Sequence, residues 1–86
     1  MNVFVYALRD RIADSFRSLS LNEADEVEQR NLAFAVNNDP HLMFMSKDLE
    51  LCRVGEMDTK SGVLTPCVPI QVVCRADQLI QKESKE

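Results

Sequence analysis

Glycine, histidine, tryptophan and long apolar runs are scarce or absent in this chain of 86 residues. It contains two glycines, one histidine and no tryptophan. Two glycines cannot build the glycine-rich loop that binds phosphates, and the lone His41 has no nucleophile or carboxylate at a catalytic spacing. No apolar run approaches the roughly 20 residues that a membrane-spanning helix needs. We therefore expect neither an enzyme nor a membrane partner.

Cysteine is too rare for a disulfide framework or a zinc finger. Cys52, Cys67 and Cys74 cannot all pair within one chain, they lack Cys-x-x-Cys spacing, and no signal peptide precedes them. The only histidine, His41, lies well before them without a finger-like spacing. This pattern predicts a reducing cytoplasm, buried thiols, and no metal or other cofactor.

Positive charge is in the minority. The chain has 10 lysines and arginines against 14 aspartates and glutamates, so its formal net charge is -4. DNA and anionic membranes repel such an excess of carboxylates. The charges are unevenly placed, because acids crowd residues 23–28 whereas Arg9, Arg11 and Arg17 cluster near the amino end. The sequence is therefore compatible with a local basic patch on a protein that is acidic as a whole.

The chain does contain enough apolar residues for one small core. Apolar residues make up 45% and charged residues 28% of it, which is ordinary globular usage. We expect a single α+β domain over residues 1–80 and a frayed polar tail over residues 81–86. A domain this short buries only about 60% of its unfolded surface, so self-association is the favoured source of extra stability.

The first half of the chain predicts a strand, a loop and a helix. Residues 3–9 are rich in β-branched and aromatic side chains on both faces, which predicts a central strand. Residues 10–21 are polar with weak periodicity, so we expect mostly a loop. The main helix should begin after Asn22, which caps it together with Asp25, and end at residues 37–40, where turn formers precede a proline.

The second half predicts a helical turn and a hairpin. The turn covers residues 41–47, a strand covers residues 49–57, and Gly62 closes the polar connection that follows. Pro66 and Pro69 interrupt the last strand and place its early part at an edge or a bulge. The order strand, helix, strand, strand predicts an α+β fold with one main helix packed on a small three-stranded sheet. We expect a homodimer, in which the two copies cover the open sheet face either by pairing their sheets or by extending them across the dimer.

Two groups of residues are candidates for binding. The first offers guanidinium groups for phosphates and a ring for stacking, as single-stranded nucleic acid requires: Arg9, Arg11, Arg17, Arg53, Arg75 and Tyr6. The alternative is that Arg53 and Arg75 pair with nearby carboxylates while Tyr6 fills a core or a dimer contact.

The second group is a cluster of adaptable apolar side chains, Met43, Phe44 and Met45, which suits a protein partner. Packing on the protein's own core is the alternative. Glu56 and Asp58 are close in sequence, but as residues beside a hairpin turn they predict solvated carboxylates rather than a magnesium site.

Three motifs give the chain a resemblance to a known family. They are Val5-Tyr6-Ala7-Leu8-Arg9-Asp10, Asn31-Leu32-Ala33-Phe34-Ala35-Val36-Asn37-Asn38-Asp39-Pro40 and, most characteristic, Cys52-Arg53-Val54-Gly55-Glu56-Met57-Asp58-Thr59-Lys60-Ser61-Gly62. With them the chain resembles the small nonstructural protein of gokushoviruses, single-stranded DNA phages of the Microviridae. The resemblance implies a protein of the infected bacterial cytoplasm, not part of the capsid, that helps in genome replication or in handing single-stranded DNA to packaging. It supplies no catalytic residues, and Cys52 and Met57 stand where the family commonly has aromatic rings.

Two functions follow from these observations. In the first, the protein binds single-stranded DNA, or a replication complex on it, through its arginines, and salt weakens this binding. In the second, it is a dimeric interaction module that does not bind DNA and engages a host or phage protein through Met43, Phe44 and Met45. The acidic balance favours the second function, and the resemblance favours the first.

Overall fold

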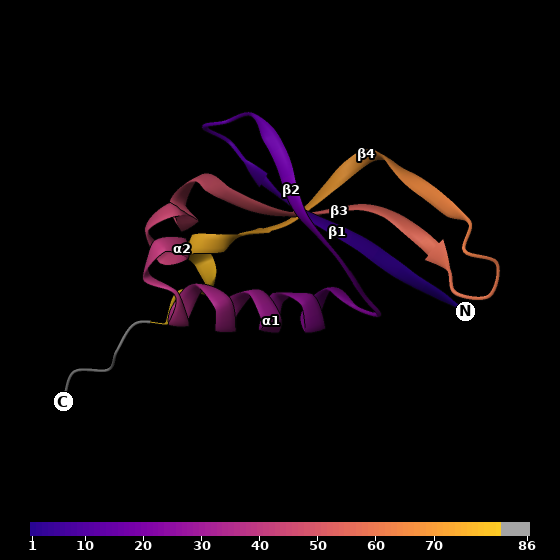
Figure 1. The fold of residues 1–86 in the computed structure, drawn as a ribbon, viewed down its shortest axis with the longest axis horizontal. Helices are drawn as coiled ribbons and strands as arrows, with labels where there is room; N and C mark the ends of the chain where they lie inside the picture. Colours follow the sequence, from indigo (N-terminus) through magenta and orange to yellow (C-terminus); the bar gives the residue numbers. More distant parts are fainter. Residues whose placement is uncertain (82–86) are drawn as a thin grey trace.

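The computed structural model describes residues 1–81 as a twisted four-stranded sheet with two helices (Figure 1). In chain order the elements are β1 (Asn2–Asp10), β2 (Ser15–Asn22), α1 (Asp25–Asn38), α2 (Pro40–Met45), the single turn η1 (Ser46–Asp48), β3 (Leu49–Asp58), β4 (Leu64–Arg75) and the single turn η2 (Ala76–Leu79). The strand order is β2-β1-β3-β4, and every neighbouring pair is antiparallel. β1 and β3 are therefore central, and β2 and β4 are the edges.

The predicted fold class, one main helix on a three-stranded sheet, is wrong. The structure is mostly sheet, with four antiparallel strands and two short helices over the described residues. The extra strand is β2, which lies in the segment predicted to be a loop. Its alternation of polar and apolar residues is interrupted at Ser18, which has a positive φ of 61° where the register with β1 shifts. Such a bulge inserts one extra residue, so Phe16 and Leu19 reach the same face although they are three apart.

The core lies between α1 and one face of the sheet. Tyr6 of β1 and Leu49 and Leu51 of β3 are buried together with Leu32 and Val36 of α1. Leu49 and Leu51 lie two apart in β3, and Tyr6 is opposite Arg53, two residues beyond Leu51. All three point to one face because side chains alternate between the two faces of a sheet. The intervening residues of β1 and β3 therefore point to the face opposite α1.

α1 begins later than predicted, and its predicted cap is wrong. Asn22 is the last residue of β2, and its Nδ2 donates a hydrogen bond to Oε1 of Glu28 at 2.6 Å. The hydroxyl of Ser20 donates to Oε2 of the same carboxylate at 2.7 Å. The N-cap residue is Ala24, whose side chain makes no capping bond. These polar contacts tie the first turns of α1 to the edge strand β2. The predicted helix end is confirmed at Asn38.

The β3–β4 hairpin confirms the strand and the turn predicted for this segment. The carboxylate of Asp58 accepts a hydrogen bond from the amide of Lys60 at 2.8 Å, and Gly62 has a φ of 78°. Pro66 and Pro69 lie in the edge strand β4, whose register with β3 is irregular in this part. A proline has no N–H to donate to a neighbouring strand, so the outer edge is where it costs least.

The structure describes the predicted helical turn fully and the predicted tail only in part. α2 confirms the helical turn predicted after residue 40, and neither helix among residues 1–81 is long and apolar enough to cross a membrane. Of the predicted tail at residues 81–86, only Gln81 is described; its amide donates to Oδ1 of Asn37 at 2.8 Å. The remainder of that tail lies outside the described residues.

Candidate functional site

A polar cluster joins the start of α1 to the sheet. The hydroxyl of Tyr6 donates to Oδ1 of Asp25 at 2.6 Å, and Arg53 donates from Nη2 to Oδ2 at 2.5 Å and from Nε to Oδ1 at 3.3 Å. The guanidinium of Arg53 also lies over the ring of Phe4, 4.5 Å from its centroid. Both charges are thus satisfied inside the protein.

The pKa values in this cluster move in the directions that such pairing dictates. Burial opposes ionisation of Asp25, but the hydrogen bonds from Arg53 and Tyr6 outweigh it and lower the pKa of Asp25. The hydrogen bond to Asp25 raises the pKa of Arg53 despite its partial burial. Burial, followed by the bond to Asp25, raises the pKa of Tyr6. The cluster therefore holds α1 on the sheet as a fixed ion pair.

The structure does not bring the predicted nucleic-acid-binding residues together on one face. Tyr6 is fully buried, and Arg53 faces α1. Arg75 is opposite Glu50 in the β3–β4 register, which puts it on the other face from Arg53, and its guanidinium pairs with Asp77 at 2.8 Å. Arg53 and Arg75 are on neighbouring strands, but they share neither a face nor the ring of Tyr6.

The remaining three arginines of the set gather at the β1–β2 hairpin. Arg9 contacts Asp14 at 2.9 Å and Glu50 at 3.7 Å, and Arg17 contacts Asp10 at 3.7 Å. Arg11 lies in the exposed turn. The neighbouring apolar residues Ile12 and Phe16 are exposed as well. The hairpin thus combines three arginines, two of them paired with carboxylates, with an exposed aromatic ring.

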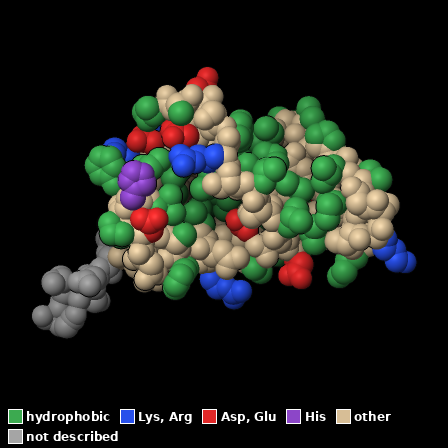
Figure 2. Space-filling view, in the orientation of Figure 1, with side chains coloured by type: hydrophobic (Ala, Val, Ile, Leu, Met, Phe, Trp, Pro, Cys, Tyr) green, Lys and Arg blue, Asp and Glu red, His purple; other side chains and the backbone are tan. Residues whose placement is uncertain are grey.

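The sheet face opposite α1 is apolar and largely open to solvent, although Ala7 and Cys52, which are opposite each other on its two central strands, are buried. The register places Val5 beside both Leu21 and Gly55, Gly55 beside Pro66, and Met57 beside Leu64. We call this surface the open face; its main apolar side chains are Phe16 (β2), Leu19 (β2), Leu21 (β2), Val5 (β1), Val54 (β3), Leu64 (β4) and Val72 (β4). Hydrophobic side chains are also prominent over the β3–β4 arm in Figure 2.

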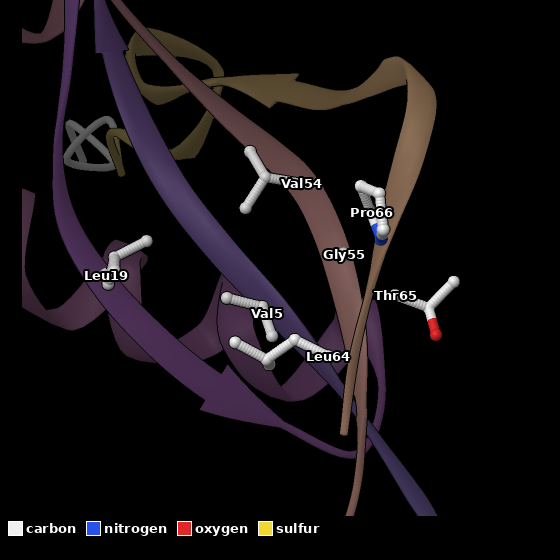
Figure 3. Close-up of a pocket in the computed structure, with 7 residues that line it drawn as sticks. All are labelled: Val5, Leu19, Val54, Gly55, Leu64, Thr65 and Pro66. Atoms are coloured by element: carbon white, nitrogen blue, oxygen red, sulfur yellow. The ribbon is translucent and has the colours of Figure 1, made fainter. Parts of the chain in front are cut away.

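A hollow of about 270 Å³ lies in the open face, lined by Val5, Leu19, Val54, Gly55, Leu64, Thr65 and Pro66 (Figure 3). Val5, Leu19 and Leu64 point toward one another in this view, whereas the hydroxyl of Thr65 points away. Gly55 is required at its floor, because an added Cβ would lie 2.9 Å from the carbonyl oxygen of Thr65. The hollow is thus shaped by aliphatic groups and a close backbone approach.

The predicted partner cluster is divided between surface and core. Met43 and Phe44 are exposed, and Lys47 lies over the Phe44 ring at 4.4 Å. Met45 is partly buried and packs against the core. Phe34 on α1 is also largely exposed, at 71%, and no sequence feature distinguished it from core residues. The cluster's role in partner binding stays a prediction.

The other polar candidates have local roles. Asp58 accepts backbone hydrogen bonds within the β3–β4 turn, and Glu56 is opposite Thr65 in the sheet. Among residues 1–81, no cluster of three or more His, Cys, Asp or Glu side chains could hold a metal ion. Burial raises the pKa of the Cys52 and Cys74 thiols, so both stay protonated and weakly reactive.

The signal for the open face was present in the sequence but incomplete. Both faces of residues 3–9 carry apolar groups, which indicates a second packing surface. The contribution of β2 was hidden by the bulge at Ser18, and the contribution of β4 depends on its pairing with β3. Only the assembled sheet brings Leu19 and Leu64 to the same hollow.

Comparison with known proteins places the chain in a phage family. The family model of the Phage ORF5 protein matches residues 3–79, which run from β1 to the end of η2. No curated protein and no solved structure matches the chain. The matched region includes the polar cluster, the β1–β2 hairpin and the open face. The chain therefore belongs to the Phage ORF5 protein family and is a bacteriophage accessory protein.

Proposed function

We propose that the protein is a nonstructural protein of a gokushovirus-type phage of the Microviridae and that it acts as a protein-interaction module. It works in the cytoplasm of the infected bacterium, in replication of the single-stranded DNA genome or in its handover to packaging. The open face carries this proposal, because an apolar surface spanning all four strands is the mark of a protein contact.

The arginines support a protein partner over DNA as the direct contact. Arg53 is engaged by Asp25, Arg75 by Asp77, and Arg9 by Asp14 and Glu50. Each of these carboxylates cancels a positive charge that a phosphate would need. The net charge of -4 adds a repulsion that any DNA contact has to overcome.

The genome role is tested in infected cells. A phage that encodes Leu19→Glu on the open face should make less single-stranded genome, while Phe34→Glu on α1 should leave the yield unchanged. The two side chains are matched, with 74% and 71% exposure, and both changes add one negative charge. Strand-specific quantification of intracellular DNA gives the readout. Normal genome synthesis and packaging with Leu19→Glu, at normal protein levels, would contradict the proposed role.

A second candidate function is direct binding of single-stranded DNA at the β1–β2 hairpin. The observation that favours it is the gathering of Arg9, Arg11 and Arg17 beside the exposed ring of Phe16. Guanidinium groups and an aromatic platform are the usual elements of single-strand binding. The family resemblance of the sequence points the same way.

Fluorescence anisotropy of labelled single-stranded and duplex DNA, titrated with pure protein over a salt series, tests the second candidate. If the hairpin binds DNA, the double variant Arg11→Ser, Arg17→Ser should lower the salt slope by about 1.4, because each single-strand phosphate contact contributes roughly 0.7. Arg75→Ser is the control, since it removes one charge outside the hairpin. Absence of binding at low salt would remove this candidate and leave the interaction module.

A further inference from the structure

We propose that the open face is a homodimer interface, in which two copies of this chain pack sheet on sheet across a two-fold axis. This inference rests on the interaction-module function proposed above and identifies its first partner as a second copy. It commits to face-to-face packing, with the helices of both copies on the outside.

The size of the open face fits an interface between small proteins. Five of its side chains, Phe16, Leu19, Leu21, Leu64 and Val72, are between 47 and 74% exposed. If full burial of one such side chain removes about 120 Å², these five alone supply roughly 350 Å² of apolar area. A standard interface buries about 800 Å² on each partner, of which somewhat more than half is apolar. The partly buried Val5 and Val54 add a smaller apolar area to this sum.

Charge favours this face over the opposite side of the molecule. On the α1 side, Glu23 and Glu26 are exposed acids, whereas Asp25 is paired with Arg53 and Glu28 is buried. Two copies that met there would bring these exposed like charges together. On the open face, the register places Arg9 beside Glu50, and their side chains lie 3.7 Å apart. Their opposite charges leave that end of the face locally neutral. A neutral, apolar patch lets two chains of net charge -4 approach.

The hollow suits a protruding side chain rather than a small polar ligand. Binding sites for metabolites combine apolar walls with a few convergent polar groups. The hollow has aliphatic walls and a backbone floor at Gly55, and the Thr65 hydroxyl points away from it. A volume of about 270 Å³ holds one or two apolar side chains. In a two-fold arrangement, each copy fills the hollow of the other.

Other occupants fit less well. Residues 82–86 of the same chain are all polar or charged, so they offer no apolar cover. An anionic membrane would be repelled by the net charge of -4. Extension of the sheet edge to edge is disfavoured at β4, since Pro66 and Pro69 lack the N–H groups that a neighbouring strand requires. Stacking of the two faces avoids this restriction.

Sedimentation velocity of the pure protein across the micromolar range tests the interface. We expect a mass of two chains, with Leu19→Glu and Leu64→Glu each weakening dimerisation at least tenfold, which is about 1.4 kcal/mol. Each dimer would bury two uncompensated carboxylates, one from each copy. Phe34→Glu, matched in exposure and charge, should leave the dimer intact. Circular dichroism confirms that each variant is folded.

Three results would overturn the proposal. They are a monomer at all concentrations, folded Leu19→Glu and Leu64→Glu proteins that remain dimeric, and a loss of the dimer with Phe34→Glu equal to that with Leu19→Glu. Because the measurement uses pure protein without phage or DNA, these results would overturn the dimer interface without contradicting the proposed genome role. A normal dimer in a protein that is dispensable for genome synthesis would instead remove the proposed function and keep the interface.

Discussion

At the scale of single residues, Asp25 is the side chain on which most of the polar structure depends. It accepts hydrogen bonds from Tyr6 and Arg53, and its pKa is lowered because these bonds outweigh the effect of burial. A carboxylate with a lower pKa in the folded than in the unfolded state stabilises the protein at neutral pH. This contribution is complete above the unfolded pKa of about 3.9 and is lost as the pH falls through the folded pKa.

Asp25→Asn should therefore cost about 1–3 kcal/mol of unfolding free energy near pH 7, since it leaves the Arg53 guanidinium without its charged partner. The difference from the native protein should shrink as the pH falls below about 4. Urea denaturation at a series of pH values measures it. Glu26→Gln, an exposed acid in the same helical turn, controls for the helix dipole. A difference that is the same at every pH would mean that the ion pair does not stabilise the fold.

At the scale of elements, α2 shows how six residues can face both the core and the solvent. Met45 packs against the core, whereas Phe44, one residue before it, is 73% exposed. Successive residues of a helix are separated by about 100°, so a short helix on the surface has to divide its apolar side chains in this way. The exposed half is available to a partner, and the buried half anchors the helix.

Met45→Ala should consequently cost about 2 kcal/mol of unfolding free energy, because it removes a side chain packed on the core. Phe44→Ala should change stability by less than about 0.5 kcal/mol. Urea denaturation of the two variants under identical conditions compares them. If Phe44→Ala is the more destabilising change, the ring is part of the fold rather than a free surface group.

At the scale of the whole molecule, charge and apolar surface are separated. The acidic first turn of α1 lies on one side of the sheet, and the open face lies on the other. The β1–β2 hairpin with its arginines projects away from α1 (Figure 1). In the proposed dimer, the open face with Phe16 is buried, whereas the exposed ring of Phe44 stays available to other partners. We therefore expect a dimer without measurable DNA affinity at moderate salt, and a monomer that binds DNA would contradict both proposals.

Local patterns in the sequence predicted the elements whose signals are continuous along the chain. The apolar run around Tyr6 predicted β1, the spacing of apolar residues up to Val36 predicted α1, and the polar turn closed by Gly62 predicted the β3–β4 hairpin. The three motifs of the resemblance predicted a phage protein, and the family match confirms that much. These signals are local because propensity, periodicity and turn chemistry each act over a few neighbouring residues.

Local sequence patterns thus account for these elements and for the excess of acidic residues. Tertiary structure alone decided the fourth strand, because the bulge at Ser18 breaks the period of two and only pairing with β1 shows that β2 is a strand. It also decided that Arg53 forms an ion pair, since its partner Asp25 is 28 residues away in the chain. The open face has the same origin, since it forms only where four strands bring Leu19 and Leu64 together. Contacts between distant residues depend on register and strand order, which local patterns do not encode.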